Sequence, residues 1–289
     1  MDNGTAGSDT DWREALNPPI YLVSVLPGLG VPLLAQVSVA HAEGLLLATV
    51  AVVLLQHAIN LFNDAADWRL GADVEKYDSW VRVHRDNPQL ATLHGTLSLV
   101  SGGLLGLGVL WYQAQFWLLW VALPMVALGY LYNAGRKPLS YTHLGEWVTG
   151  ICYGPGVFGC LWLVAGLEPG IGMLAGSVAF AALAVALLLS HQPPQIETDR
   201  HAGKQSFAVR FGAERTVFTA RVLFLVFLTA TLGGIVVGGE AGIGFALFAV
   251  AVVLFGVIAR GPVNPKRILL AACLFLICGL LASSLSGIH

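Results

Sequence analysis

Residues 45–67 read LLLATVAVVLLQHAINLFNDAAD, and this stretch indicates the class of fold. It contains no Asp, Glu, Lys or Arg before Asp64. A helix needs about 20 mostly apolar residues to cross a bilayer, and this run is long enough. Similar apolar runs recur along the chain, near residues 19–39, 45–66, 92–112, 115–133, 144–165, 171–190, 216–237, 241–259 and 267–286. The sequence therefore predicts an all-α membrane bundle of nine transmembrane helices.

The composition indicates a lipid environment for most of the chain. Of its 289 residues, 56% are hydrophobic and 11% are charged, whereas soluble domains carry about 25% charged residues. The net charge of -2 argues against a nucleic-acid partner. We expect residues 18–289 to form a single domain in the lipid bilayer. Residues 1–17 are polar and are expected to be a disordered cytoplasmic lead-in, with an amphipathic turn around Trp12.

The basic residues predict an orientation for these spans. All 15 Lys and Arg lie on one side: before the first span, after the second, fourth, sixth and eighth, or early in the seventh. The connections on the opposite side carry none. Because basic residues accumulate on the cytoplasmic side of membrane proteins, we expect the N-terminus in the cytoplasm.

A first cluster of polar side chains ends the second span. Asn60, Asn63, Asp64 and Asp67 share one face at helical spacing. Two carboxylates three residues apart repel each other unless a cation lies between them. Mg²⁺ suits this position, because it takes oxygen ligands and is commonly bound by one or two carboxylates together with substrate phosphates. The alternative is an ordinary polar end of a helix, and these residues alone favour neither interpretation.

A second cluster follows the sixth span on the same side. On a continuous helix, His191, Gln195 and Asp199 would align at i, i+4 and i+8, and Arg200 and Lys204 add cations. Taken alone, this pattern is more typical of a surface salt-bridge cluster. Two similar clusters on one side of a bundle instead favour a shared anion with bridging metal.

A third stretch on that side covers residues 130–141 and contains Arg136, Lys137 and Tyr141. The two cations can bind a diphosphate, and a tyrosine can offer a hydroxyl donor or an aromatic face. The alternative is a topology signal combined with an interfacial aromatic belt.

These motifs resemble those of the UbiA superfamily of intramembrane prenyltransferases. Asn63-Asp64-x-x-Asp67 resembles the first Asp-rich motif of that family. The run Ile196-Glu197-Thr198-Asp199-Arg200-x-x-Gly203-Lys204 resembles the second. Lys137-Pro138-Leu139-Ser140-Tyr141-x-x-Leu144-Gly145-Glu146 and Tyr153-Gly154-Pro155 look like the branch that prenylates 1,4-dihydroxy-2-naphthoate. The resemblance extends from about Pro19 to the end of the chain, and the family's nine-helix bundle agrees with the spans above.

The resemblance implies an activity, a cofactor and a location. It implies Mg²⁺-dependent transfer of a polyprenyl chain from its diphosphate to an aromatic acceptor, with 1,4-dihydroxy-2-naphthoate in menaquinone biosynthesis as the expected acceptor. The protein would lie in a bacterial or archaeal plasma membrane with its active site facing the cytoplasm. The implied metal ligands are Asn63, Asp64, Asp67 and Asp199, and the implied catalytic residues are Asp64, Asp67, Asp199 and Lys137. The implied diphosphate-binding residues are Asn60, Asn63, Arg82, Arg136, Lys137, Arg200, Lys204 and Tyr141.

One departure from the family pattern concerns the acceptor side. The family usually has a carboxylate four residues before Asp199, where this chain has Gln195. A glutamine can coordinate through its carbonyl but brings no charge, so a second metal should bind more weakly, or the site works through one metal and the cations. If the missing carboxylate activates the acceptor, that role would pass to Glu197, to His191 or to the substrate itself. The acceptor-site candidates are therefore His191, Gln195, Glu197 and Tyr153.

Other functions remain open at this point. Within the superfamily they are transfer to a 4-hydroxybenzoate-type acceptor, terpene cyclisation and lipid-ether synthesis. Outside it they are a multi-span transporter and a non-catalytic binder of prenyl lipids. Transporters tend to place charged groups near the midplane of the membrane, whereas nearly all charges here lie at one rim.

Overall fold

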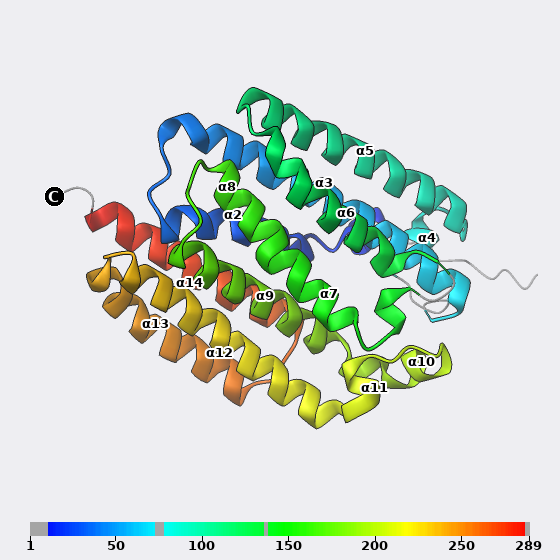
Figure 1. Ribbon diagram of the computed structural model, residues 1–289. Helices are drawn as coiled ribbons and strands as arrows, with labels where there is room; N and C mark the ends of the chain where they lie inside the picture. The colour runs from blue at the N-terminus through cyan, green and yellow to red at the C-terminus, as the bar shows by residue number, and fades with distance from the viewer. Residues whose placement is uncertain (1–10, 73–77, 136–137, 287–289) are drawn as a thin grey trace, which may run out of the picture.

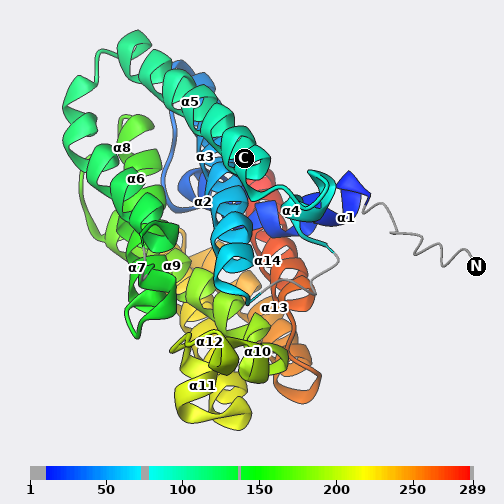
Figure 2. The same cartoon turned by 90° about the vertical axis from the view of Figure 1, so that its right-hand side faces the viewer.

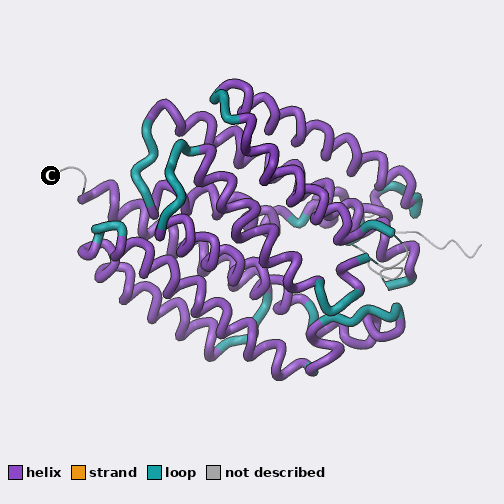
Figure 3. Tube along the Cα trace, viewed as in Figure 1, coloured by secondary structure: helices purple, strands orange, loops and turns teal. Residues whose placement is uncertain are grey.

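The computed structural model describes residues 11–72, 78–135 and 138–286, and every regular element in these ranges is a helix, as Figure 3 shows. Nine candidate membrane spans lie within the described residues. They are Trp12–Leu34, made of α1 (Trp12–Leu16), η1 (Pro18–Tyr21) and α2 (Leu22–Leu34); α3 (Val39–Leu70); α5 (Pro88–Tyr112); Phe116–Asn133, made of η2 (Phe116–Leu118) and α6 (Leu119–Asn133); Gly145–Val164, made of α7 (Gly145–Ile151), η4 (Cys152–Phe158) and α8 (Gly159–Val164); α9 (Ile171–His191); α12 (Ala213–Val237); α13 (Ala241–Arg260); and α14 (Pro265–Ser286). The predicted all-α bundle with nine spans is confirmed.

A short helix precedes the first long helix. It is α1, which covers Trp12–Leu16, where the sequence predicts a turn around Trp12. Asp11 caps this helix, because its carboxylate accepts a hydrogen bond from the backbone N–H of Arg13. The first ten residues lie outside the described part of the chain.

The fifth span contains a widened turn around a proline. Residues Cys152–Phe158 form a π-helix, and Pro155 lies inside it. Proline has no N–H to donate to the preceding turn, so the regular α-helical ladder cannot continue through it. Gly154 allows close approach of a neighbouring helix, because a Cβ there would collide with the backbone oxygen of Ser177. This turn places Cys152 and Tyr153 on the inner side of the span.

The core is centred on α9, which packs against α2, α7, η4, α12 and α14. Figure 2 shows the long helices gathered side by side around this region. Phe158 stacks on Phe180 of α9 with ring centroids 5.1 Å apart, and Phe227 of α12 packs edge-on against Phe180. Outside this core, large apolar side chains stay exposed, such as Trp120 at 85% and Phe245 at 83%. A soluble monomer rarely exposes such a surface, so we interpret it as the lipid-facing side.

The short helices that lie outside the nine spans gather at one end of the bundle. They are α4 (Trp80–Val83), η3 (Leu139–Tyr141), η5 (Pro193–Gln195), α10 (Ile196–His201) and α11 (Phe207–Phe211). Figure 1 shows α4, α10 and α11 at the end opposite the C-terminus. The basic connections lie at this same end. We call it the basic end of the bundle.

The sixth span stops where the sequence places two prolines. Helix α9 ends at His191, and η5 separates it from α10. His191, Gln195 and Asp199 therefore do not lie on one continuous helix, and the alignment at i, i+4 and i+8 is not formed. The reason is that Pro193 and Pro194 supply no backbone donors.

Candidate active site

Asp67 lies buried at the end of α3, with one side-chain partner on the same helix and another 74 residues away in the sequence. Its side chain accepts a hydrogen bond at Oδ1 from the Tyr141 hydroxyl, at 2.7 Å. At Oδ2 it accepts one from the Asn63 amide, at 2.9 Å. Only 3% of Asp67 is exposed, and a buried carboxylate is stable only with such partners. Asn63, Asp67 and Tyr141, all predicted site residues, therefore meet.

Asp199 of α10 is the second buried carboxylate at this end. Its Oδ2 atom accepts a hydrogen bond from the Ser206 hydroxyl at 2.8 Å. The chain turns back toward Asp199 at Gly203, whose φ of 75° favours glycine. The turn closes with a hydrogen bond from the Lys204 N–H to the Asp199 carbonyl, at 2.8 Å.

Lys204 joins the two acidic motifs. Its Nζ atom lies 3.7 Å from Oδ2 of Asp67 and 3.8 Å from Oδ1 of Asp199. Because both distances start from the same Nζ atom, the separation between the two carboxylate oxygens cannot exceed the sum of the two distances. The ammonium also lies 5.3 Å from the centroid of the Tyr141 ring. The structure thus brings together Asp67, Asp199, Lys204 and Tyr141, which come from three separate stretches of the sequence.

Glu146 fixes the segment that carries Lys204 and Ser206. Its carboxylate accepts hydrogen bonds from the backbone N–H of Phe207 at 2.7 Å and from the Gln192 amide at 3.1 Å. The same carboxylate lies 3.5 Å from the Arg210 guanidinium. In addition, the Gln205 N–H donates to the Tyr141 carbonyl at 3.0 Å. These contacts tie the segment after α10 to the segment that precedes the fifth span.

Asp64 is also buried, with 7% exposed, and is held on the side of α3 that faces α4. Its Oδ2 atom accepts a hydrogen bond from the backbone N–H of Trp80 at 2.8 Å. This contact satisfies one of the unpaired donors at the start of α4. Asp64 therefore also holds the start of α4 against the end of α3.

The donor set fits a hard divalent cation. Asn63, Asp64, Asp67 and Asp199 offer only oxygen ligands from buried or half-buried side chains. Within the described ranges, no three His, Cys, Asp or Glu side chains are placed to enclose an ion by themselves. Mg²⁺ does not require such a cage, because it keeps several waters and uses substrate phosphates as further ligands.

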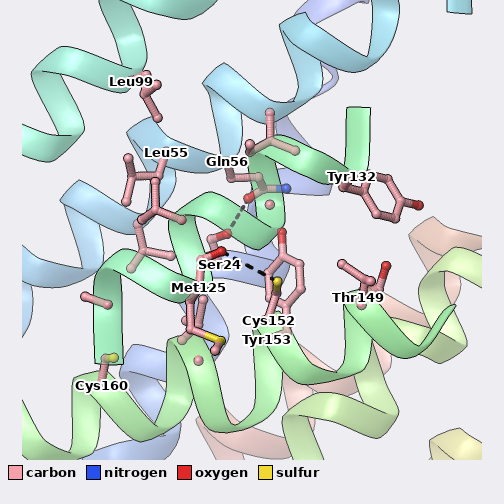
Figure 4. A pocket seen from close by; sticks show the side chains of 18 of the residues that line it. Ser24, Leu55, Gln56, Leu99, Met125, Tyr132, Thr149, Cys152, Tyr153 and Cys160 are labelled. Carbon is pink, nitrogen blue, oxygen red and sulfur yellow. Dashed lines mark hydrogen bonds between the residues drawn. The ribbon is translucent and has the colours of Figure 1, made fainter. Parts of the chain in front are cut away.

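A largely apolar cavity of ≈ 270 Å³ begins beside this cluster. Asn60, which lies one turn before Asp64 on α3, is part of its wall. Figure 4 shows Tyr132 and Thr149 at one end of the cavity and Cys160 at the other. Between these ends the walls are mostly aliphatic, with the polar side chains of Ser24, Gln56 and Tyr153 along them. Of the predicted acceptor-site residues, Tyr153 lines this cavity.

The remaining predicted residues lie elsewhere. Arg200 and Glu197 are exposed on α10 and pair with each other at 2.7 Å. Arg82 lies over the ring of Trp68 and pairs with Asp86 at 2.9 Å. His191 lines a second cavity of ≈ 230 Å³.

Three further predicted residues need separate mention. Gln195, at the end of η5, is half-buried. Arg136 and Lys137 lie outside the described residues, so their predicted roles stay predictions.

Several residues of the site were not predicted. Ser206 gives no signal in the sequence beyond its position after the Gly203 turn. Gln56 and His57 do give one, because polar side chains in an apolar span require partners. Gln56 accepts a hydrogen bond from Ser24 of α2, and His57 contacts the Tyr21 hydroxyl at 2.6 Å.

The geometry can be compared with known proteins. The family model described as the UbiA prenyltransferase family matches residues 22–266. The chain belongs to the UbiA prenyltransferase family. It is therefore an integral membrane protein and a prenyltransferase, as the motifs predicted.

Two curated relatives cover most of the chain. A 2-carboxy-1,4-naphthoquinone phytyltransferase from Synechocystis sp. is 32% identical over 76% of this chain and 72% of its own length. A 1,4-dihydroxy-2-naphthoate octaprenyltransferase from Mycobacterium tuberculosis is 32% identical over 78% of this chain and 80% of its own length. Both names describe prenyl transfer to a naphthalene-derived acceptor, which is the branch that the motifs favoured.

Solved UbiA structures share the fold. A UbiA homologue from Aeropyrum pernix, solved in its apo form, has a TM-score of 0.68 and 16% identity, covering 93% of this chain and 98% of its own. A UbiA homologue from Archaeoglobus fulgidus, solved bound to GPP and Mg²⁺, has a TM-score of 0.60 and 18% identity, covering 94% of this chain and 99% of its own. At these identities the likeness supports the fold alone.

Proposed function

We propose that this UbiA-family protein transfers a polyprenyl chain from its diphosphate to a 1,4-dihydroxy-2-naphthoate-type acceptor, with Mg²⁺ as cofactor, in the biosynthesis of a menaquinone-type quinone. The names of both curated relatives support this acceptor class. The Archaeoglobus fulgidus structure, described as bound to GPP and Mg²⁺, supports the donor and the cofactor.

One structural observation carries the proposal: the two acidic motifs meet at Lys204 beside an apolar cavity. The clustered carboxylates and the ammonium suit a metal-bound diphosphate, whereas the aliphatic walls suit an isoprenoid tail. Asn60 lies at the junction, since it lines the cavity and precedes Asp64 by one helical turn. The head and tail of one amphiphilic donor can therefore be bound together.

The charged residues would act on the leaving group. Breaking the allylic C–O bond places negative charge on the diphosphate, and preorganised cations lower the barrier to this step. Lys204 would supply one such charge. Asn63, Asp64, Asp67 and Asp199 would hold Mg²⁺, which when bound neutralises diphosphate charge. Tyr141 and Ser206 would keep the two carboxylates oriented through the hydrogen bonds described above.

The cavity would protect the reacting carbon. An allylic carbocation reacts readily with water, so the reaction needs a dry surrounding. The aliphatic walls exclude water, and the faces of Tyr132 and Tyr153 can stabilise positive charge. The aromatic acceptor would attack from this cavity through a ring carbon. Loss of the group that this carbon carried, a proton or the carboxyl group as carbon dioxide, would then restore the aromatic ring.

The departure at Gln195 leaves acceptor activation to other groups. An electron-rich naphthoate needs little activation, and Tyr153 is the predicted acceptor-site residue that lines the cavity. We expect the basic end to face the cytoplasm of a bacterial or archaeal plasma membrane, because basic residues accumulate on that side.

Product analysis tests the proposal. Membranes containing the purified protein are given Mg²⁺, a geranylgeranyl or longer diphosphate, and either the naphthoate or 4-hydroxybenzoate, and products are identified by mass spectrometry. We expect a prenylated naphthalene product that disappears with EDTA and returns with Mg²⁺. Exclusive use of 4-hydroxybenzoate, cyclised terpene without acceptor, or turnover in EDTA would each contradict it.

A further inference from the structure

The largely apolar cavity has a hydrogen-bonded polar pair in its wall. Ser24 of α2 and Gln56 of α3 both line the cavity, and Figure 4 shows them next to each other, with Leu55 to one side and Tyr132 to the other. Both are buried, with 0% of Ser24 and 7% of Gln56 exposed. A hydrocarbon tail offers no hydrogen-bonding partner to such a pair. The pair therefore suits a ligand that carries oxygen atoms.

The bonds of this pair fix the orientation of the Gln56 amide. Its Oε1 atom accepts a hydrogen bond from the Ser24 hydroxyl, and its Nε2 atom donates one to the backbone carbonyl of Ile20 at 3.3 Å. A primary amide has two N–H donors and an oxygen with two lone pairs. Within the described residues these bonds use one donor and one lone pair, so one of each is left for a ligand in the cavity.

The position of Gln56 along α3 fits the place of an aromatic acceptor. Gln56 and Asn60 line the cavity from the same face of α3, one helical turn or about 6 Å apart, and Asp64 lies one turn further on. The reacting carbon of the donor is bonded to the diphosphate, so we expect this carbon near Asn60. An acceptor ring placed against that carbon would extend toward Gln56.

The pair is uncharged, and this selects the part of the acceptor that it suits. In a dihydroxynaphthoate the carboxylate is anionic, whereas the ring hydroxyls are neutral. A carboxylate is best bound by a cation, and Lys204 lies at the acidic site beyond Asn60. The ring hydroxyl further from the carboxylate would then lie toward Gln56, where the amide can donate to its oxygen and accept its hydrogen.

We propose that Gln56, held in place by Ser24, binds the ring hydroxyl that lies further from the carboxylate of the naphthoate acceptor. This contact would determine which acceptor is preferred. The inference rests on the proposed function, because it names the part of that acceptor that the cavity recognises. Gln56 would touch the substrate, whereas Ser24 would be a positioning residue that acts through Gln56.

Helix packing alone does not account for the pair. Polar side chains often join neighbouring helices within a membrane. However, α2 and α3 already approach closely one turn further along α2, where a Cβ on Gly28 would collide with the Thr49 side chain. Ser98 provides a comparison, because its hydroxyl donates to the Leu54 carbonyl at 2.8 Å and joins α5 to α3. Unlike Ser98, both members of the pair line the cavity.

Calorimetry with two acceptors tests the proposal without turnover. The protein in detergent, with Mg²⁺ and inorganic pyrophosphate and without oxygen, is titrated with 1,4-dihydroxy-2-naphthoate or with 1-hydroxy-2-naphthoate, which lacks the hydroxyl in question. One hydrogen bond to a neutral group corresponds to a roughly three- to tenfold change in Kd. We expect wild type to prefer the dihydroxy acceptor by this factor. Gln56→Met should bind both acceptors equally, because methionine has a similar length but no N–H.

Two further variants separate recognition from packing. Ser24→Ala should reduce the preference about twofold, since the amide keeps its donor but loses its support. The control is Ser98→Ala, which removes a bond between α5 and α3 and should keep the wild-type preference. The preference is a ratio of two Kd values for one variant, so a general loss of packing leaves it unchanged. An unchanged ratio in Gln56→Met or in Ser24→Ala would overturn the proposal.

Turnover separates this inference from the proposed function. With Mg²⁺ and a prenyl diphosphate, Gln56→Met should show a roughly three- to tenfold higher KM for 1,4-dihydroxy-2-naphthoate and an unchanged KM for the prenyl diphosphate. Wild-type prenylation of this acceptor, combined with an unchanged preference in Gln56→Met, would overturn the role of Gln56 and leave the proposed function standing. A wild-type protein that neither binds nor prenylates either naphthoate would refute the proposed function, and this inference with it.

Discussion

At the scale of single residues, the candidate site depends on charges that balance one another. Asp67 and Asp199 are both buried, and Lys204 lies within 4 Å of a carboxylate oxygen from each. Two buried carboxylates near each other are unfavourable without a cation. Lys204 supplies that positive charge. In the complex with the diphosphate donor, a bound divalent metal would supply part of it.

Asp67→Asn tests the importance of the charge at nearly constant shape. The amide cannot neutralise Lys204 or bind Mg²⁺ as a carboxylate, so we expect kcat for prenyl transfer to fall by at least ~10²-fold, the range of one lost electrostatic contact in an active site. The protein level in membranes should not change. The matched control is Glu240→Gln, an exposed residue at the opposite end, which should keep wild-type turnover. Near-normal turnover in Asp67→Asn would refute the placement of the metal.

At the scale of elements, two connections position the chemistry. Glu146 ties the segment after α10 to the start of the fifth span, and the segment carries Ser206 and Lys204. The fifth span in turn carries the cavity wall from Thr149 to Cys160.

Glu146→Ala should loosen this connection. It leaves the Phe207 N–H and the Gln192 amide without their acceptor, and an unsatisfied buried donor costs about 1–3 kcal/mol. We expect a lower midpoint of thermal inactivation in detergent, together with lower kcat because Lys204 is less well positioned. Glu168→Ala, at an exposed position in an opposite connection, should change neither quantity. An unchanged midpoint would show that the Glu146 contacts do not hold the segment.

Cys160→Trp should shorten the cavity from its far end. The larger side chain must occupy space that a long isoprenoid tail would use, and overpacking of this kind typically costs about 1–3 kcal/mol. We expect KM for long donors to rise roughly tenfold or more, the equivalent of about 1.4 kcal/mol, with KM for dimethylallyl diphosphate unchanged. The control is Ile151→Trp on the exposed face of the same span. Equal effects on short and long donors would place the tail elsewhere.

At the scale of the whole molecule, the bundle separates a charged end from an apolar body. The short helices, the acidic motifs and the basic connections share the end opposite the C-terminus (Figure 1). Exposed apolar side chains surround the body between the two ends. This arrangement suits an enzyme that takes a water-soluble headgroup from one side and a tail from the lipid.

The predicted orientation has a direct test. In a cysteine-free background, Glu214→Cys lies at the basic end and Glu168→Cys in an opposite connection, and both positions are exposed. A membrane-impermeant maleimide should label Glu214→Cys in inverted vesicles and Glu168→Cys in right-side-out vesicles, because we expect the basic end to face the cytoplasm. The reverse pattern would place the active site on the outer face.

The sequence by itself determined the helical class, the nine spans and the composition of the acidic face of α3. These features are local, because the length of an apolar run and the 3.6-residue period act within one helix. Asn60, Asn63, Asp64 and Asp67 could therefore be placed on one face without any knowledge of neighbouring helices.

Only the tertiary structure decided which of these groups meet. The Tyr141–Asp67 hydrogen bond joins residues 74 positions apart, and Lys204 reaches Asp67 because the segment after α10 folds back to the end of α3. The apolar cavity arises in the same way, from helices distant in sequence. The periodicity of one helix shows which face is polar, but it contains no information on which other helix that face will contact. That choice depends on how the side chains of the bundle pack together.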